Sequence, residues 1–207
     1  MRDIMMGALR ASLVTWLLCG IAYPLALTGL GQLLMPFQAN GSLARNQDGT
    51  IIGSRLIGQF WDGPEWFHGR PSATTDRDPN DPTKTVSAPY NAASSGASNL
   101  GPTSKDFAER LAADREALER SQPELMGVAL PADMLTASAS GLDPDVSPAN
   151  AALQVARVAR ERGAPSAEIR SLLERQISGR SFGVFGEPRV NVLDLNLALQ
   201  RAYPRSD

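Results

Sequence analysis

The stretch that most limits what this chain can fold into is residues 11–35, ASLVTWLLCGIAYPLALTGLGQLLM, which contain no charged side chain. Crossing the hydrocarbon core of a bilayer takes about 20 mostly apolar residues, each adding about 1.5 Å of helix, and this stretch is longer than that. Pro24 is compatible with a span, because helices in lipid tolerate proline when neighbouring groups satisfy the freed carbonyl. The stretch therefore predicts one transmembrane helix near the N-terminus.

Small residues on the predicted span indicate that it packs against other helices. Gly20 and Gly29 would let a second backbone approach closely, and Thr15 and Thr28 add polar groups that can bond across a helix pair. We therefore expect Gly20 and Gly29 to be helix-packing positions.

Two alternatives to a membrane span remain. A cleavable signal peptide has an apolar region of about 7 to 15 residues before a small-x-small cleavage site, whereas this run is longer and the nearest such site, residues 39–41, comes late. A buried helix of a soluble protein would show a regular polar stripe, and residues 11–35 do not.

Composition limits the nature of the chain beyond the span. The chain has 207 residues, 43% of them hydrophobic, and a formal charge of −2, so the predicted division is an N-terminal segment, 1–39, and one domain, 40–207. Charged residues are balanced and dispersed, which argues against a nucleic-acid partner and against a polybasic patch for anionic lipid. The sole cysteine, Cys19, lies in the span, so the domain has no disulfide, thiolate metal site or cysteine nucleophile.

The orientation follows weakly from charge. Arg2 and Arg10 precede the span, and Arg45 is the first basic residue after it. This small excess favours an N-terminus inside and an extracytoplasmic domain, although the rule weakens when a large domain follows the span. A cytoplasmic domain remains the alternative.

The domain is expected to begin with a hairpin and a long loop region. Residues 42–44 and 50–57 are short apolar runs on either side of Asn46-Gln47-Asp48-Gly49, a strong hairpin signal. Residues 59–102 are rich in proline and glycine with interleaved aromatics, and no regular helix fits them. Within them, the polar insert at 74–84 is expected to lack ordered structure.

Capping residues and helical spacing predict the second half of the domain. The expected elements are a helix from the cap Ser104 to Ser121, a helix from Ser147-Pro148 to Gly163, a helix from the cap Ser166 to Gly179, a strand at 189–193, and a last helix capped by Asp194. The predicted fold class is a single N-terminal transmembrane helix followed by one α/β (α+β) soluble domain.

Motifs that carry chemistry are missing from the sequence. It holds no phosphate-binding P-loop, no His-Glu-x-x-His, no paired Cys-x-x-Cys and no Gly-x-Ser-x-Gly. His68 is the only histidine, and its aromatic, turn-rich setting is more typical of a structural residue than of a base. No metal site is predicted, because the remaining ligands would be carboxylates in the solvated insert.

Four stretches are distinctive enough to indicate a family. They are residues 53–73 (GSRLIGQFWDGPEWFHGRPSA), 89–102 (PYNAASSGASNLGP), 136–148 (TASASGLDPDVSP) with the helix after it, which carries Gln154 and Arg157, and 179–199 (GRSFGVFGEPRVNVLDLNLAL). Together with the N-terminal span, they resemble the C subunit of Kdp-type potassium-transporting P-type ATPases over nearly the whole chain. The sequence departs from that pattern at Trp66, Ala97 and Asp145, where the family tends to have Tyr, Gly and His.

The resemblance implies an accessory subunit of a complex in the bacterial cytoplasmic (inner) membrane. Its partners would be a potassium-channel-like subunit and an ATP-hydrolysing subunit, which carry out transport and hydrolysis. The sequence agrees independently, because one helix cannot supply the ring of carbonyls of a potassium filter, and no phosphorylatable Asp-Lys-Thr-Gly is present. No firmly bound cofactor is expected.

The resemblance also implies a chaperone that raises the ATP affinity of the hydrolysing subunit. ATP is cytosolic, whereas the domain is predicted to lie outside, so we expect ATP to be involved only through the complex. Ser138, Ser140, Gly141 and Asp143 form a small-residue turn before a helix, which could cradle an anion, but such turns more often cap backbone amides.

Polar residues in the loops are candidates for partner contact, although Asn and Arg in glycine-rich loops often tie loops together. The partner-contact or nucleotide-related candidates are His68, Arg70, Tyr90, Asn91, Ser98, Asn99, Ser138, Ser140, Gly141, Asp143 and Arg189. The alternatives from other classes are a membrane-tethered extracytoplasmic hydrolase that uses Ser72 or Ser98 with His68, and a binding module of another membrane complex.

Overall fold

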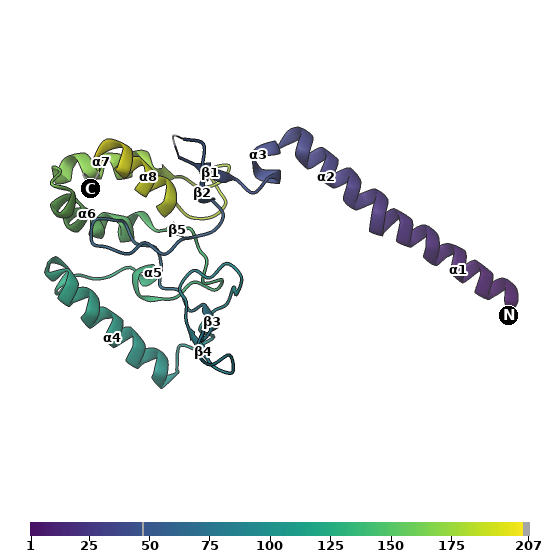
Figure 1. Cartoon of the computed structure of the whole chain (residues 1–207), viewed down its shortest axis with the longest axis horizontal. Coiled ribbons are helices and arrows are strands. Elements are labelled where there is room, and N and C mark those ends of the chain that lie inside the picture. The colour runs from purple at the N-terminus through teal and green to yellow at the C-terminus, as the bar shows by residue number, and fades with distance from the viewer. Residues whose placement is uncertain (47, 205–207) are drawn as a thin grey trace. The chain divides into compact units, whose positions relative to one another are not determined.

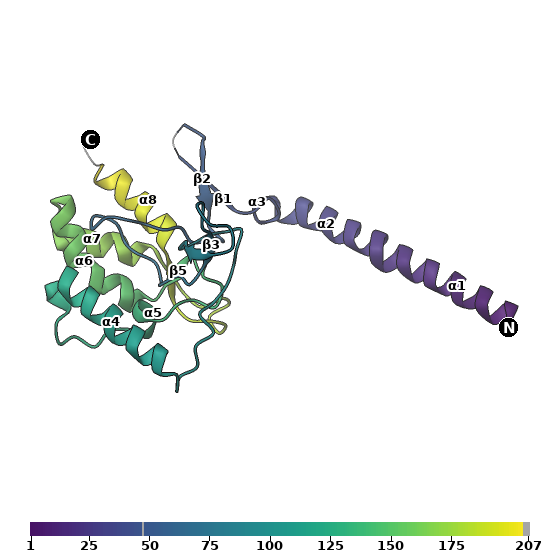
Figure 2. The ribbon, with the colours of Figure 1, turned by 60° about the horizontal axis from the view of Figure 1, so that its bottom comes forward.

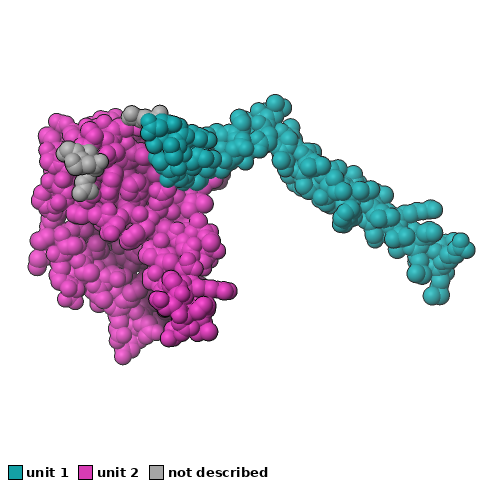
Figure 3. Space-filling model, in the orientation of Figure 1, with its two compact units in different colours: residues 1–54 teal, residues 55–207 magenta. Residues whose placement is uncertain are grey.

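The computed structural model describes residues 1–46 and 48–204, and the chain divides into two compact units, Met1–Ser54 and Arg55–Asp207. Figure 3 colours the two units separately. The predicted domain limits, 1–39 and 40–207, stay a prediction.

The first unit contains the predicted span. Helix α1 (Arg2–Leu17), the π-helical turn η1 (Leu18–Ala22) and helix α2 (Tyr23–Leu34) follow one another without a break (Figure 1). This 33-residue helix is long and apolar enough to cross a membrane, and none of its most apolar window is buried. The prediction of an N-terminal span followed by a soluble domain with helices and small sheets is confirmed.

The π-helical turn lies directly before Pro24. The N–H of Tyr23 donates to the carbonyl of Leu18, five residues earlier, where an α-helix would use four. Pro24 has no N–H to give to the carbonyl of Gly20. The helix therefore passes the proline with one widened turn.

The first unit ends in the predicted hairpin. A short helix, α3 (Pro36–Ala39), precedes strands β1 (Leu43–Arg45) and β2 (Ile51–Ser54), which pair antiparallel with Leu43 opposite Ser54. The strand predicted at 50–57 stops at Ser54. Gln47, in the predicted turn, lies outside the described residues.

The second unit is built around a small antiparallel sheet and three helices (Figures 1 and 2). The sheet has the order β5 (Asp145–Val146), β7 (Arg189–Asn191), β6 (Ile177–Ser178), and the helices are α6 (Pro148–Arg162), α7 (Ser166–Arg175) and α8 (Val192–Ala202). Their apolar faces form one core with a single loop residue, Phe67; the other members are Val146, Ala151, Val155, Val158, Ala159, Ile169, Leu172, Leu173, Val190, Val192, Leu195 and Leu199.

The predicted limits of α6 are confirmed. The hydroxyl of Ser147 accepts from the N–H of Asn150 at 3.1 Å, Pro148 occupies the first turn, and Gly163 ends the helix with a φ of 62°. This left-handed conformation is open to glycine because it has no Cβ.

The limits predicted for the last two helices are wrong. Ser166 is the first residue of α7, capped by Pro165 without a side-chain bond, and the helix ends at Arg175, because Ile177 pairs with Val190 in the sheet. Helix α8 is capped by Asn191, whose side chain accepts from the N–H of Asp194. Asp194 is therefore inside the helix.

The loop region 59–102 contains no helix, as predicted. The prediction that the insert at 74–84 lacks ordered structure is wrong. Strands β3 (Thr75–Arg77) and β4 (Thr85–Ser87) form an antiparallel hairpin in which Asp76 lies opposite Val86. Its turn is held by Asp81, whose carboxylate accepts from the N–H and hydroxyl of Thr83.

Helix α4 (Lys105–Ser121) is capped by Ser104, as predicted, and leads through η2 (Pro123–Leu125) to α5 (Ala132–Leu135). None of the α4 residues, all of which the structure describes, is buried. In Figures 1 and 2 this helix lies at the edge of the second unit. It forms one side of a pocket in that unit.

Candidate functional site

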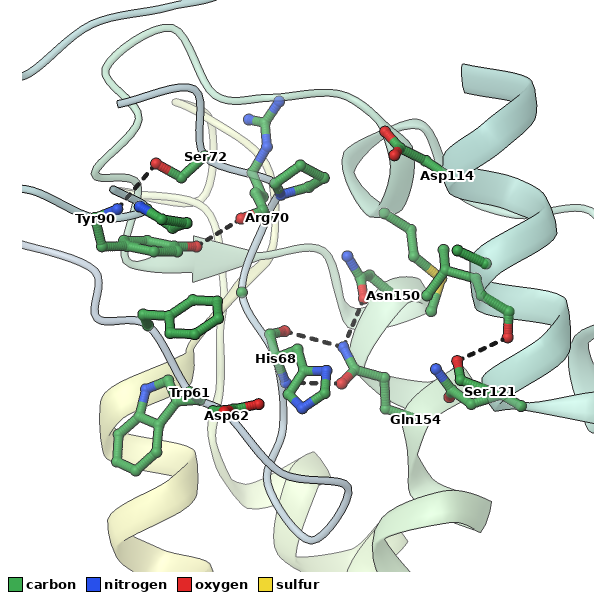
Figure 4. Close-up of a pocket in the computed structure, with 18 residues that line it drawn as sticks. Trp61, Asp62, His68, Arg70, Ser72, Tyr90, Asp114, Ser121, Asn150 and Gln154 are labelled. Carbon is green, nitrogen blue, oxygen red and sulfur yellow. Dashed lines mark hydrogen bonds between the residues drawn. The ribbon is translucent and has the colours of Figure 1, made fainter. Parts of the chain in front are cut away.

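A pocket of about 470 Å³ in the second unit brings together several of the predicted residues (Figure 4). One side consists of the loop from Phe60 to Ser72 with Pro89 and Tyr90, and the other consists of α4, α5 and α6. His68, Arg70 and Tyr90 line it. The pocket therefore lies where the first two distinctive sequence stretches meet α6, the helix that follows the third stretch.

Buried amides bind the backbone of the loop that forms the pocket wall. Gln154 of α6 accepts from the N–H of His68 at 2.8 Å and donates to its carbonyl at 3.0 Å. Asn196 of α8 makes the same pair of bonds with Phe67, both at 2.9 Å. Each side-chain amide thus satisfies both the N–H and the carbonyl of one loop residue, as a neighbouring strand would in a sheet. Helices α6 and α8 therefore hold residues 67 and 68 in place.

A buried arginine completes this attachment. Arg157 donates to the carbonyl of Pro64, to that of Trp66 at 2.9 Å, and to the side-chain oxygen of Gln154 at 2.7 Å. Burial lowers the pKa of Arg157 to about 10, so the guanidinium is still charged at neutral pH. We call Gln154, Arg157 and Asn196 the loop clamp.

His68 contributes its side chain to the pocket as a neutral group. Its Nε2–H donates to the carbonyl of Gly63 at 2.8 Å. Burial lowers the pKa of His68, and the charge of Arg157 lowers it further. The imidazole is therefore anchored to its own loop.

The serine that would pair with His68 in a hydrolase is used elsewhere. The hydroxyl of Ser72 donates to the carbonyl of Gly141 at 2.8 Å and accepts from the N–H of Tyr90 at 3.0 Å. In the described part of the chain no hydrogen bond joins Ser72 to His68, and Ser98 does not line the pocket. This geometry does not favour a serine hydrolase.

Tyr90 is held by the loops around it. Its hydroxyl donates to the carbonyl of Arg70 at 2.7 Å, and Arg70 in turn pairs with Asp143 at 3.1 Å. Burial, together with the charge of Asp143, raises the pKa of Tyr90 to about 12, so the phenol remains a donor. A Cβ on Gly58 would lie 2.4 Å from the Tyr90 ring, and one on Gly69 would lie 2.3 Å from its oxygen, so the ring needs glycine at both positions.

The small-residue turn binds other loops. The carbonyl of Ser140 accepts from the N–H of Gly96 and from the hydroxyl of Ser95, both at 2.9 Å. The N–H of Ser138 donates to the carbonyl of Pro71 at 3.2 Å. Gly141 has a φ of 68°, and a Cβ there would lie 2.7 Å from the carbonyl oxygen of Gly96. These groups support the structural alternative for the turn.

The remaining candidates lie outside the pocket. Asn91 donates from its side chain to the carbonyl of Thr75 at 3.0 Å, which ties the hairpin of the insert to the loop. Asn99 has a positive φ of 53°. Arg189 pairs with Asp145 at 3.3 Å; burial raises the pKa of Asp145, and the charge of Arg189 opposes that rise.

Sequence patterns alone assign no role to the three clamp residues. Gln154 and Arg157 lie on the helix after the third distinctive stretch, and Asn196 lies in the fourth stretch. Their signal is a polar side chain on an otherwise apolar helix face, as for Gln154 beside Ala151 and Val155. Such a residue predicts a buried hydrogen bond, but not its partner.

Comparison with known proteins identifies the family. Residues 5–201 match the family model KdpC, described as K+-transporting ATPase, c chain. A protein of Rhodopseudomonas palustris named Potassium-transporting ATPase KdpC subunit is 54% identical over 198 residues, which cover 96% of each chain. Proteins of the same name from Bradyrhizobium diazoefficiens and Methylobacterium nodulans are each 56% identical, over 92% and 88% of this chain and 92% and 89% of their own. The chain therefore belongs to the KdpC family, the c chains of K+-transporting ATPases.

Proposed function

We propose that this chain is a non-catalytic accessory subunit that assembles with the channel-like and the ATP-hydrolysing subunits of a K+-transporting ATPase. Membership of the KdpC family carries this proposal. It is supported by the one candidate span found among the described residues, since one helix cannot by itself enclose a potassium filter. It is also supported by the pocket, where His68 and Ser72 each bond to backbone carbonyls.

The span is the proposed contact with partner helices. A Cβ on Gly29 would meet nothing within 4 Å, and one on Gly20 would only touch Trp16 at 3.9 Å, so larger side chains fit the isolated helix. Replacing either glycine with Leu is therefore expected to leave the chain folded and to reduce its co-purification with the complex, because close backbone approach is lost. Gly7→Leu, earlier in the same helix and equally open, is the control. Full assembly of both variants would count against this helix face.

The proposed location is the bacterial inner membrane, with the N-terminus inside and the domain outside. A cysteine at Ser94, which is exposed in the second unit, is expected to react with an impermeant maleimide in cells with a permeabilised outer membrane. Ser42 would be a poor position, because it is 4% exposed. The native Cys19 is replaced by Ser in the background. Labelling only after the inner membrane is lysed would contradict this orientation.

The proposed effect on ATP use is indirect. In the small-residue turn, the N–H of Ser138 donates to the carbonyl of Pro71 and the N–H of Gly141 donates to the carbonyl of Ser138, so these two donors are already used, and the sequence has no phosphate-binding loop. A subunit that stabilises one conformation of the pump can change ATP affinity without touching nucleotide, typically by about 1 to 3 kcal/mol. No firmly bound cofactor is needed for such a role.

A further inference from the structure

One apolar surface of the second unit has no role in its core. It is the turn between β6 and β7, residues 180–187, which leaves the body of the unit as a yellow-green loop in Figure 2. Phe182 is 95% exposed, Val184 69% and Phe185 67%. We call these three side chains the apolar turn. Large apolar side chains gathered on one exposed segment are typical of an interaction site.

The turn is held in one shape by its own backbone. Ser181 and Phe185 exchange two hydrogen bonds, at 2.8 and 2.9 Å, and the N–H of Val184 donates to the carbonyl of Ser181 at 3.2 Å. Phe182 has a φ of 53°, an unfavourable conformation for a bulky residue. The backbone hydrogen bonds of the turn therefore keep Phe182 in this unfavourable conformation, with its side chain almost fully exposed.

The base of the turn is closed by an ion pair. The guanidinium of Arg180 donates to both carboxylate oxygens of Glu187, at 2.8 and 2.6 Å. The next cation, Arg189, is paired with Asp145. The turn therefore presents apolar side chains on a support without excess positive charge.

We infer that the apolar turn inserts into an apolar pocket on another protein subunit of the same ATPase, and this inference rests on the proposed function. A preformed turn loses little conformational freedom when it docks into a pocket of matching shape. A fluid bilayer has no fixed shape to match, and loops that bind anionic lipid usually combine apolar side chains with unpaired basic residues. The paired charges at the base favour a protein partner.

The test compares assembly of full-length variants co-expressed with the other subunits. Phe182→Ser combined with Phe185→Ser is expected to weaken retention of the chain in the complex by about tenfold or more, since buried aromatic anchors dominate many interfaces. Thermal unfolding of the purified variant should match that of the unaltered chain, because both side chains are exposed. Met126→Ser, which removes an exposed side chain elsewhere in the unit, is the control and should assemble normally.

A photo-crosslinking arm identifies the partner. A benzophenone attached to a cysteine at Val184, in a Cys19→Ser background, is expected to form an adduct with another subunit. Adducts with lipid alone, or retention of the double variant equal to that of the unaltered chain, would overturn the inference while the proposed function stands. If the unaltered chain did not assemble with the other subunits, the proposed function would fail, and the inference with it.

Discussion

Replacing Phe67 with Ala is expected to lower the free energy of unfolding by about 3 to 5 kcal/mol, the usual range for removing a buried phenylalanine. Phe67 is 0% exposed and is the loop residue of a core otherwise built by α6, α7, α8 and the sheet. The ring thus joins the pocket wall to the body of the unit. Because domains of this size are stable by only about 5 to 15 kcal/mol, much of the margin would be lost.

The measurement is urea unfolding of the detergent-solubilised chain, followed by the near-ultraviolet signal of the domain. Phe67→Leu, which keeps most of the volume, should cost less than about 1.5 kcal/mol. Phe60→Ala removes an exposed ring from the same loop and should change stability by no more than about 0.5 kcal/mol. A loss below about 1 kcal/mol for Phe67→Ala would show that the loop is not part of the core.

Replacing Arg157 with Met is expected to cost about 3 kcal/mol. The change keeps a long apolar side chain but leaves the carbonyls of Pro64 and Trp66 without the donor that Arg157 supplies, and each unsatisfied buried acceptor costs about 1 to 3 kcal/mol. The oxygen of Gln154 loses one of its two donors and keeps the N–H of His68. Relief from burying the guanidinium, whose lowered pKa reflects that burial, offsets part of the loss.

The same unfolding experiment, with hydrogen exchange added, separates the clamp from a general loss of stability. Amides of residues 66–68 should exchange faster in Arg157→Met, under conditions in which those of α7 do not. The loss of stability in Arg157→Lys should lie between zero and that of Arg157→Met, because lysine keeps the charge but lacks the planar fork of arginine. Arg160→Met, on the same helix, breaks only exposed ion pairs and should cost less than about 1 kcal/mol. Equal losses at positions 157 and 160 would contradict the clamp.

Local signals explain which parts of the fold could be predicted. The span, the first hairpin, α4 and α6 each carry their signal within a few neighbouring residues, such as Ser147-Pro148 at the start of α6 and Gly163 at its end. The end of α7 could not be placed, because Ile177 continues the helical spacing but pairs with Val190 in the sheet. The insert is polar enough to suggest disorder, yet Asp81 and Thr83 stabilise a turn that lets its strands pair.

The site was predictable in its residues but not in its connections. Two of the four distinctive stretches contain His68, Arg70 and Tyr90, and the structure brings these three together. The bonds that organise the pocket join residues far apart in sequence: Gln154 is 86 positions from His68, and Asn196 is 129 from Phe67. No local pattern specifies which backbone groups such amides bind, so the clamp required the folded chain.

Calorimetric titration of ATP into the purified, detergent-solubilised chain is the sharpest test of a non-catalytic accessory role, since such a subunit should hold no nucleotide of its own. We expect no binding tighter than about 1 mM, an interaction of about 4 kcal/mol. The complete complex, with its hydrolysing subunit, should bind ATP in the same buffer. Micromolar binding by the lone chain, abolished by Ser140→Ala together with Asp143→Ala, would establish a direct nucleotide site at the small-residue turn and contradict the indirect role.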